Sequence, residues 1–164
     1  LTTLGNGVSN YTAQNKGAGH MDRIQEGFKA GLQLVWTLSL PVTVLYFFLC
    51  RPILLVFMDA SAAEAVRTGI IYLRILSPFY SIIAIKLVAD GILRGAGLMK
   101  EFMIDTFSDL ILRVVFAVIL SRTALGSLGI WCAWPIGWTS GTLLSIYLYR
   151  RGPWYKDKKV VLSD

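Results

Sequence analysis

Two long uncharged stretches constrain the fold of this chain more than any other feature of its sequence. Residues 30–50 and 123–149 contain no Asp, Glu, Lys or Arg, over 21 and 27 positions respectively. About 20 apolar residues in a helix span the hydrocarbon core of a bilayer. A soluble protein of 164 residues would have to enclose two helices that are apolar on every face. The stretches therefore predict membrane-spanning helices.

The composition agrees with an all-α integral membrane protein. Hydrophobic residues make up 55% of the chain, the mean hydropathy is +0.59, and charged residues make up 16%, against about 25% in typical soluble domains. Hydrophobic runs and their breaks predict a helical bundle: a partial helix, four transmembrane helices and a basic tail. The predicted segments are 1–16 for the end of a truncated helix, 30–55, 68–93, 102–121 and 128–149 for the transmembrane helices, and 150–164 for the tail.

The net charge of +6 does not indicate a nucleic-acid interface. The basic residues lie in short loops and in the tail, without the aromatic-interleaved basic face of a nucleic-acid-binding protein. They are concentrated on one side of the predicted spans, and loops rich in Lys and Arg stay in the cytoplasm. We therefore expect a multi-pass protein of the cell membrane with a cytoplasmic C-terminus. In the tail, Trp154 and Tyr155 are expected at the headgroup layer.

Besides Arg74 in the first half of the second predicted span, five charged residues interrupt the second and third spans: Lys86, Asp90, Asp105, Asp109 and Arg113. A charge near the centre of a membrane helix costs about 2.5–3.5 kcal/mol and is usually kept for a function. Spacing of i, i+4 places the first two residues on one helix face and the other three on a second face. Counted from the turn between two antiparallel helices, Lys86 should lie level with Asp109. Asp109 is also the expected partner of Arg113.

These charges allow two interpretations. Three acids against two bases leave one carboxylate unpaired, and a carboxylate in a low-dielectric site resists ionisation. On the first interpretation, Asp90 or Asp109 is a titrating, cation-linked acid, and Lys86, Asp105 and Arg113 line the ion or substrate pathway. On the second, all five form a static polar network that fixes two helices, and those near the cytoplasmic end extend toward water.

The last predicted span carries tryptophans at helical spacing. Trp134 and Trp138 are candidates for an aromatic cavity wall that binds flat organic cations by cation–π contact. The alternative is an interfacial aromatic belt with a packing role, because Trp131 falls near the predicted outer boundary. Gly137 and Gly141 have the small-xxx-small spacing that lets membrane helices approach closely. No nucleophile–base pair with His, metal-ligand spacing or cofactor motif is present in the sequence.

Short motifs along the chain resemble those of one transporter family. Gly7-Val-Ser9, Thr12-Ala-Gln-Asn15 and Gly17-Ala-Gly19 resemble the end of the eighth helix of MATE (multidrug and toxic compound extrusion) transporters. Gly91-Ile-Leu-Arg-Gly-Ala-Gly97 resembles the end of their tenth helix, and Leu112-Arg113 and Gly129-Ile-Trp131 resemble motifs in the next two helices. The turn Gly95-Ala-Gly97 also repeats Gly17-Ala-Gly19 within this chain. The ordered set covers nearly the whole sequence.

The resemblance implies the C-terminal part of a transporter of twelve helices in two lobes. Such a protein exports small organic cations or drugs against an inward flow of Na+ or H+, with no cofactor beyond this coupling ion and no enzyme activity. The implied partners are the lipid bilayer and the missing N-terminal helices of the same transporter. The chain departs from the family where some relatives carry a cation-binding aspartate in the tenth helix, because Ile83 aligns there. Leu98-Met99 and Lys100 also replace an acidic-Thr pair and a proline.

Three other functions are compatible with parts of the sequence. A flippase for lipid-linked oligosaccharides has a related architecture but is expected to line its cavity with more basic residues. A polytopic membrane enzyme would use Asp90, Asp105 and Asp109 for acid–base or metal chemistry, although no His or Asp-x-x-Asp pattern accompanies them. A passive structural subunit would pair with another integral protein and transport nothing.

Overall fold

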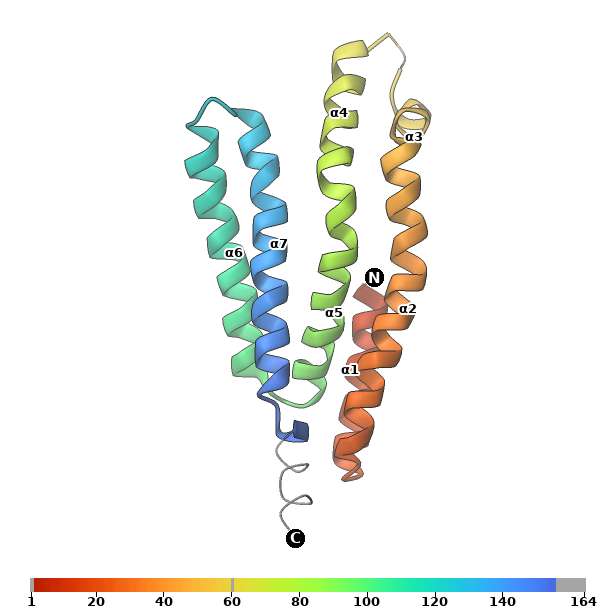
Figure 1. Cartoon of the computed structure of the whole chain (residues 1–164), viewed down its shortest axis with the longest axis vertical. Helices are drawn as coiled ribbons and strands as arrows, with labels where there is room; N and C mark the ends of the chain where they lie inside the picture. Colours follow the sequence, from red (N-terminus) through yellow and green to blue (C-terminus); the bar gives the residue numbers. More distant parts are fainter. Residues whose placement is uncertain (1, 60, 156–164) are drawn as a thin grey trace.

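The described chain is built of helices (Figure 1). The computed structural model describes residues 2–59 and 61–155, and no strand occurs within these ranges. The α6–α7 hairpin lies beside α5, and α1 and α2 pack on another side of α5. The elements are α1 (Thr2–Gly17), α2 (Met21–Phe48), α3 (Cys50–Phe57), α4 (Ala63–Leu76), a 3-10 turn (Ser77–Phe79), α5 (Tyr80–Gly95), α6 (Met99–Ser121), α7 (Ser127–Arg150) and a second 3-10 turn (Pro153–Tyr155). The prediction of an all-α fold is confirmed.

The surface and the interior of the bundle both differ from those of a typical water-soluble protein. Large apolar side chains point outward, with Phe48 and Phe57 exposed by 73% and 83%. In the interior, Asp105 is 0% exposed. Helix α2 and the stretch Ala63–Gly95 are long and apolar enough to cross a membrane. Outward apolar and inward charged side chains are the arrangement expected of a membrane helical bundle.

The first predicted span, 30–55, is divided in the structure. Helix α2 starts earlier, at Met21, passes through Pro41, and ends at Phe48, after which α3 continues to Phe57. Pro52 explains the break, because it has no N–H to donate to the carbonyl of Phe48 and its ring collides with that carbonyl. The range 30–55 therefore falls on two consecutive helices, and that it forms one span stays a prediction.

The other predicted spans fall on helices of the structure. Range 68–93 lies in α4 and α5, which are joined by the 3-10 turn that contains Pro78. Ranges 102–121 and 128–149 lie within α6 and α7, which contain 23 and 24 residues. That all four segments cross a bilayer stays a prediction.

The repeated Gly-Ala-Gly motif makes the same turn twice. At each site the second glycine has a positive φ, 79° for Gly19 and 73° for Gly97, a conformation that glycine adopts without steric cost. The N–H of the following residue then donates to the carbonyl five residues back, at 2.8 Å in both turns. This pattern satisfies a carbonyl at the helix end and closes α1 and α5 in the same way.

Glycines bring α1 and α5 into close contact. A Cβ on Gly91 or Gly95 would collide with the carbonyl oxygens of Gly5 and Ser9 on α1. The backbones can approach this closely because neither glycine has a side chain. Helix α1 thus covers one face of α5, and a neighbouring face of α5 packs against α6 and α7.

The start of the predicted tail folds back onto the bundle. Trp154 is 2% exposed and its ring lies 5.5 Å from the ring of Tyr149, within an apolar cluster of α2, α5 and α7. Gln25 on α2 donates a hydrogen bond to the Trp154 carbonyl at 2.8 Å. Trp154 is therefore buried against protein, and its expected place at the depth of the headgroup layer stays a prediction. The expected basic tail at 156–164 and the side chain of Tyr155 lie outside the described residues.

Candidate functional site

A stripe of small residues on α7 makes room for charged side chains in the bundle. The stripe consists of Gly137, Gly141 and Ser145, spaced four residues apart. A Cβ on Gly137 would lie 2.8 Å from Oδ1 of Asp109, and one on Gly141 would lie 2.9 Å from Cε of Lys86. Larger residues would displace these side chains, so the stripe lets charged groups from α5 and α6 meet against α7.

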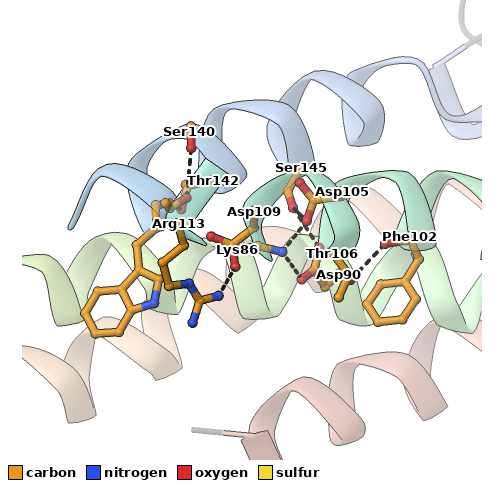
Figure 2. Close-up of polar contacts among 12 residues, drawn as sticks. Lys86, Asp90, Phe102, Asp105, Thr106, Asp109, Arg113, Ser140, Thr142 and Ser145 are labelled. Carbon is orange, nitrogen blue, oxygen red and sulfur yellow. Dashed lines mark hydrogen bonds and ion pairs between the residues drawn. The ribbon is translucent and has the colours of Figure 1, made fainter. Parts of the chain in front are cut away.

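Four residues form what we call the lysine cluster: Lys86 and Asp90 on α5, Asp105 on α6 and Ser145 on α7 (Figure 2). The Lys86 ammonium donates to Asp90 at 2.7 Å and also to Asp105. The Ser145 hydroxyl oxygen lies 2.7 Å from Oδ1 of Asp90 and 2.8 Å from Oδ2 of Asp105. No member is more than 7% exposed. The cluster therefore joins three helices through buried, charge-assisted hydrogen bonds.

Asp109 and Arg113 form a second group, the arginine pair. The Arg113 guanidinium donates to Asp109 at 2.6 Å, and it also lies over the Trp134 ring, 4.6 Å from its centre. The Asp109 side chain is 9% exposed and that of Arg113 is 22% exposed. The predicted pairing of Arg113 with Asp109 is confirmed (Figure 2).

One expectation about pairing is wrong. Lys86 and Asp109 both border Gly141, in agreement with the prediction that they lie level, and the Lys86 ammonium bonds to Asp105 while Arg113 bonds to Asp109. No carboxylate of the three is left without a basic partner. Asp90 and Asp105 instead share one lysine, so the excess of acid is present as two carboxylates on a single cation.

A cavity of about 310 Å³ opens beside both groups. Lys86, Asp90, Asp109 and Arg113 line it together with Trp138. Asp105 does not line the cavity, and it is connected to the lining residues through its hydrogen bonds with Lys86 and Ser145. The remaining lining residues are Thr2, Asn6, Ile83, Leu87, Arg94, Phe102 and Thr106.

The two tryptophans predicted to share a wall face different spaces. Trp138 lines the charged cavity, and its ring centre lies 5.7 Å from that of Tyr80. Trp134 lines a separate groove of about 610 Å³, together with Trp131 and Tyr72. Only Trp138 is therefore placed to contact a molecule bound beside the carboxylates.

Several buried polar atoms at the site have no hydrogen-bond partner. They are Oδ1 of Asp105, Oδ1 of Asp109 and Nε of Arg113. Buried polar atoms are normally satisfied, and an exception calls for an explanation. A purely static network would be expected to have a hydrogen-bond partner for every buried polar atom, and this network does not. Among the described residues, no group of three or more His, Cys, Asp or Glu side chains is placed to hold a metal ion.

The sequence patterns did not predict Ser145 as a site residue. It is the only member of the lysine cluster that is neither charged nor within α5 or α6. A signal was present, because Ser145 continues the four-residue spacing of Gly137 and Gly141. That spacing was interpreted as helix packing alone.

The sequence also matches a known protein family. The MatE family model matches residues 1–119, well over half of the chain. The chain belongs to the MatE family. Members of this family are membrane transporters of the multidrug and toxic compound extrusion type and not enzymes. The match includes both acids of the lysine cluster and the arginine pair, whereas Ser145 and the tryptophans of α7 follow it. Searches of curated proteins and of solved structures gave no match.

Proposed function

We propose that this MatE chain belongs to a secondary active exporter that moves organic cations or drugs against an inward flow of H+ or Na+. The observation that carries the proposal is the cavity beside buried carboxylates. Its wall combines Asp90 and Asp109 with the ring of Trp138. Carboxylates attract a cation, and an indole face contacts a flat cationic ring through cation–π attraction. Such a wall suits the substrate class expected of the family.

The lysine cluster supports a cationic substrate over an anionic one. Two basic groups in the wall are engaged by acids, since Lys86 is bonded to two carboxylates and Arg113 to Asp109. A third, Arg94, contacts Asn6 and the Phe102 ring and forms no ion pair among the described residues. With both of its acids ionised, the lysine cluster carries one net negative charge, which attracts a cation. A flippase that handles the anionic headgroup of a lipid-linked sugar would be expected to present more than one free basic group.

Coupling follows from competition for this negative charge. A coupling ion that neutralises the cluster removes the attraction for a drug cation, and loss of the ion restores it. A ligand shifts a conformational equilibrium only as far as its affinities for the two states differ. Alternate occupation by ion and drug supplies such a difference, so that the inward flow of one drives the outward flow of the other.

The proposed setting is the cell membrane, with several spans and a cytoplasmic C-terminus. Concentration of Lys and Arg in the loops of one side supports this orientation. The partners are the lipid bilayer and the N-terminal helices that complete the cavity. The proposal includes no enzyme activity and no cofactor other than the coupling ion.

Export can be tested in cells that lack their own efflux pumps. The full-length protein should lower the accumulation of a fluorescent organic cation such as ethidium, and a protonophore or Na+ replacement should abolish the effect. Asp90→Asn and Asp109→Asn should each weaken the coupling between cation export and the ion gradient. Ser140→Ala is the matched control, because the Ser140 hydroxyl bonds only to carbonyls of its own helix, Ile136 and Gly137.

Two outcomes would contradict the proposal. Unchanged coupling in both Asp variants would remove these acids from the mechanism. Turnover of a lipid substrate in the absence of any ion gradient would instead favour a membrane enzyme or a flippase.

A further inference from the structure

The Ser145 hydroxyl makes two close oxygen–oxygen contacts, one with each acid of the lysine cluster. If both acids were ionised, only one of these contacts could contain a hydrogen atom. The hydroxyl oxygen lies within hydrogen-bond distance of Asp90 Oδ1, at 2.7 Å, and of Asp105 Oδ2, at 2.8 Å. A serine hydroxyl has one hydrogen to donate. It can satisfy one carboxylate, and the second oxygen–oxygen contact then needs a hydrogen from the other carboxyl group. The geometry accordingly fits two acids that share one extra proton.

The surroundings indicate which acid carries this proton. Both oxygens of Asp90 are bonded, Oδ1 to Ser145 and Oδ2 to Lys86. In Asp105, Oδ1 is buried without a partner, and the side chain is 0% exposed. An unpaired oxygen of an ionised carboxylate costs more in the interior than that of a neutral acid. The neutral form therefore belongs to Asp105.

We propose that Asp90, Ser145 and Asp105 form a proton-binding relay in which Asp105 holds the proton. A proton from the cavity binds Asp90, and Asp90 passes a proton to the Ser145 oxygen. The Ser145 hydroxyl proton moves at the same time to Asp105, so that one O–H bond breaks for each one formed. After this proton transfer, Asp90 is ionised on the cavity wall and Asp105 is neutral behind it. In the exporter proposed above, on which this role in coupling rests, H+ is then the coupling ion.

The charged groups near the relay come from α5 and α6. Helix α5 contributes the Lys86 ammonium and, one turn beyond Asp90, the Arg94 guanidinium, which lies over the Phe102 ring and forms no ion pair among the described residues. Helix α6 contributes Asp109, which Arg113 neutralises one turn away. Helix α7 has no Asp, Glu, Lys or Arg between Ser127 and Tyr149. Tyr149 lies one turn beyond Ser145 on the same helix, and its ring stacks on Phe28. One proton makes the lysine cluster neutral, which lowers the cost of keeping it inside a membrane.

A sodium ion fits this position poorly. The space between Asp90 and Asp105 is taken by the Lys86 ammonium, which hydrogen-bonds to both. A second fixed cation there would face strong repulsion at short distance in a low-dielectric site. A proton needs no such space, because it lies within the hydrogen bond between a carboxyl group and Ser145. The structure thus favours H+ over Na+ at this site.

The proton can be observed without any drug. Purified full-length protein in detergent is titrated with base while infrared difference spectra follow the C=O stretch of protonated carboxyl groups. We expect one buried carboxylic-acid band in the wild type, lost as the pH rises. Asp105→Asn should remove it, and Asp109→Asn should retain it. The proposal is overturned if folded wild-type protein lacks the band or if the band persists in Asp105→Asn.

Ser145 is tested as a positioning residue through the midpoint of that titration. Ser145→Ala removes the hydroxyl that contacts both carboxyl groups, so the midpoint at which the band disappears should shift by about one pH unit from that of the wild type. Ser145→Thr keeps the hydroxyl and should restore the wild-type midpoint, and Ser140→Ala should leave it unchanged. An unaltered midpoint in Ser145→Ala would eliminate the relay, whatever its effect on protein yield.

This experiment separates the two proposals. A band with the expected dependence on Asp105, in a protein that exports no cation, would leave the proton site standing and refute the proposed function. Export driven by a Na+ gradient, together with absence of the band, would do the reverse.

Discussion

The lysine cluster and the arginine pair contain the same kinds of groups but differ in how they are built. The arginine pair lies on one helix, with its two residues spaced i, i+4, and the Arg113 side chain is 22% exposed. The lysine cluster joins three helices, and its Asp105 side chain is 0% exposed. A pair within one helix is preserved when helices move relative to each other. A cluster between helices is remade by such movement, and it is therefore the better candidate for coupling ion binding to transport.

The largest effect is expected from removing the cation of the lysine cluster. Lys86→Met leaves Asp90 and Asp105 buried without a basic partner. Breaking a buried ion pair by removing one member typically costs about 3–5 kcal/mol, because the remaining charge is uncompensated. The free energy of unfolding of the purified protein in detergent, measured by denaturant titration, should fall by this amount.

The matched control is the double variant Lys86→Met with Asp90→Asn. It removes the ionised carboxylate together with the lysine, so it should recover a large part of the lost stability. A double variant no more stable than Lys86→Met alone would show that the lysine acts through its packing and not through its charge.

Some of the fold could be predicted from the sequence because it depends on local rules. Uncharged runs of 21 and 27 residues indicate long apolar helices, and the two Gly-Ala-Gly turns follow from the left-handed conformation that glycine permits. The break after Phe48 was missed because a proline in a membrane helix can be accommodated or can end it. Pro41 and Pro52 have these two different outcomes in one segment, and tertiary packing decides between them.

A medium effect is expected from filling the small-residue stripe of α7. Gly141→Ala places a Cβ 2.9 Å from Lys86 Cε and 3.2 Å from Asp109 Cβ, so both groups must shift. Overpacking of this kind costs about 1–3 kcal/mol. Gly137→Ala places a Cβ 2.8 Å from Asp109 Oδ1 and 3.2 Å from Arg113 Cβ, and it should perturb the arginine pair alone.

The infrared titration distinguishes these two glycine variants. Gly141→Ala should change the midpoint of the carboxyl band because it displaces Lys86, and Gly137→Ala should not. Equal shifts in both variants would mean that the two charged groups are not independent.

Some contacts of the site can be predicted from sequence spacing, and others cannot. The pairing of Asp109 with Arg113 follows from i, i+4 spacing on one helix. Contact of Lys86 with Asp105 depends on how α5, α6 and α7 are rotated about their axes, and this is fixed by Gly137, Gly141 and the α1 contact. Ser145 is uncharged and far along the chain, so its role became visible only when the helices were assembled.

A smaller effect is expected for the arginine pair. A double-mutant cycle with Asp109→Asn and Arg113→Gln should give a coupling energy of about 1 kcal/mol, since the pair is partly exposed and lies within one helix. The corresponding cycle with Lys86→Met and Asp90→Asn should give a clearly larger coupling energy, since this ion pair is more deeply buried. Coupling energies of equal size would contradict the distinction between a pair that shapes one helix and a cluster that joins three.

The smallest effect is expected for the aromatic contact of the arginine pair. Trp134→Leu removes the ring over which the Arg113 guanidinium lies at 4.6 Å, and a partly exposed cation–π contact contributes about 0.5–1 kcal/mol. Cation export should change little, because Trp134 does not line the charged cavity. Trp138→Leu is the comparison: Trp138 does line that cavity, so this variant should weaken binding of a fluorescent organic cation, measured by titration of the purified protein. A weaker affinity in Trp134→Leu than in Trp138→Leu would place the drug in the groove of Trp134, away from the carboxylates, and would separate drug binding from the lysine cluster.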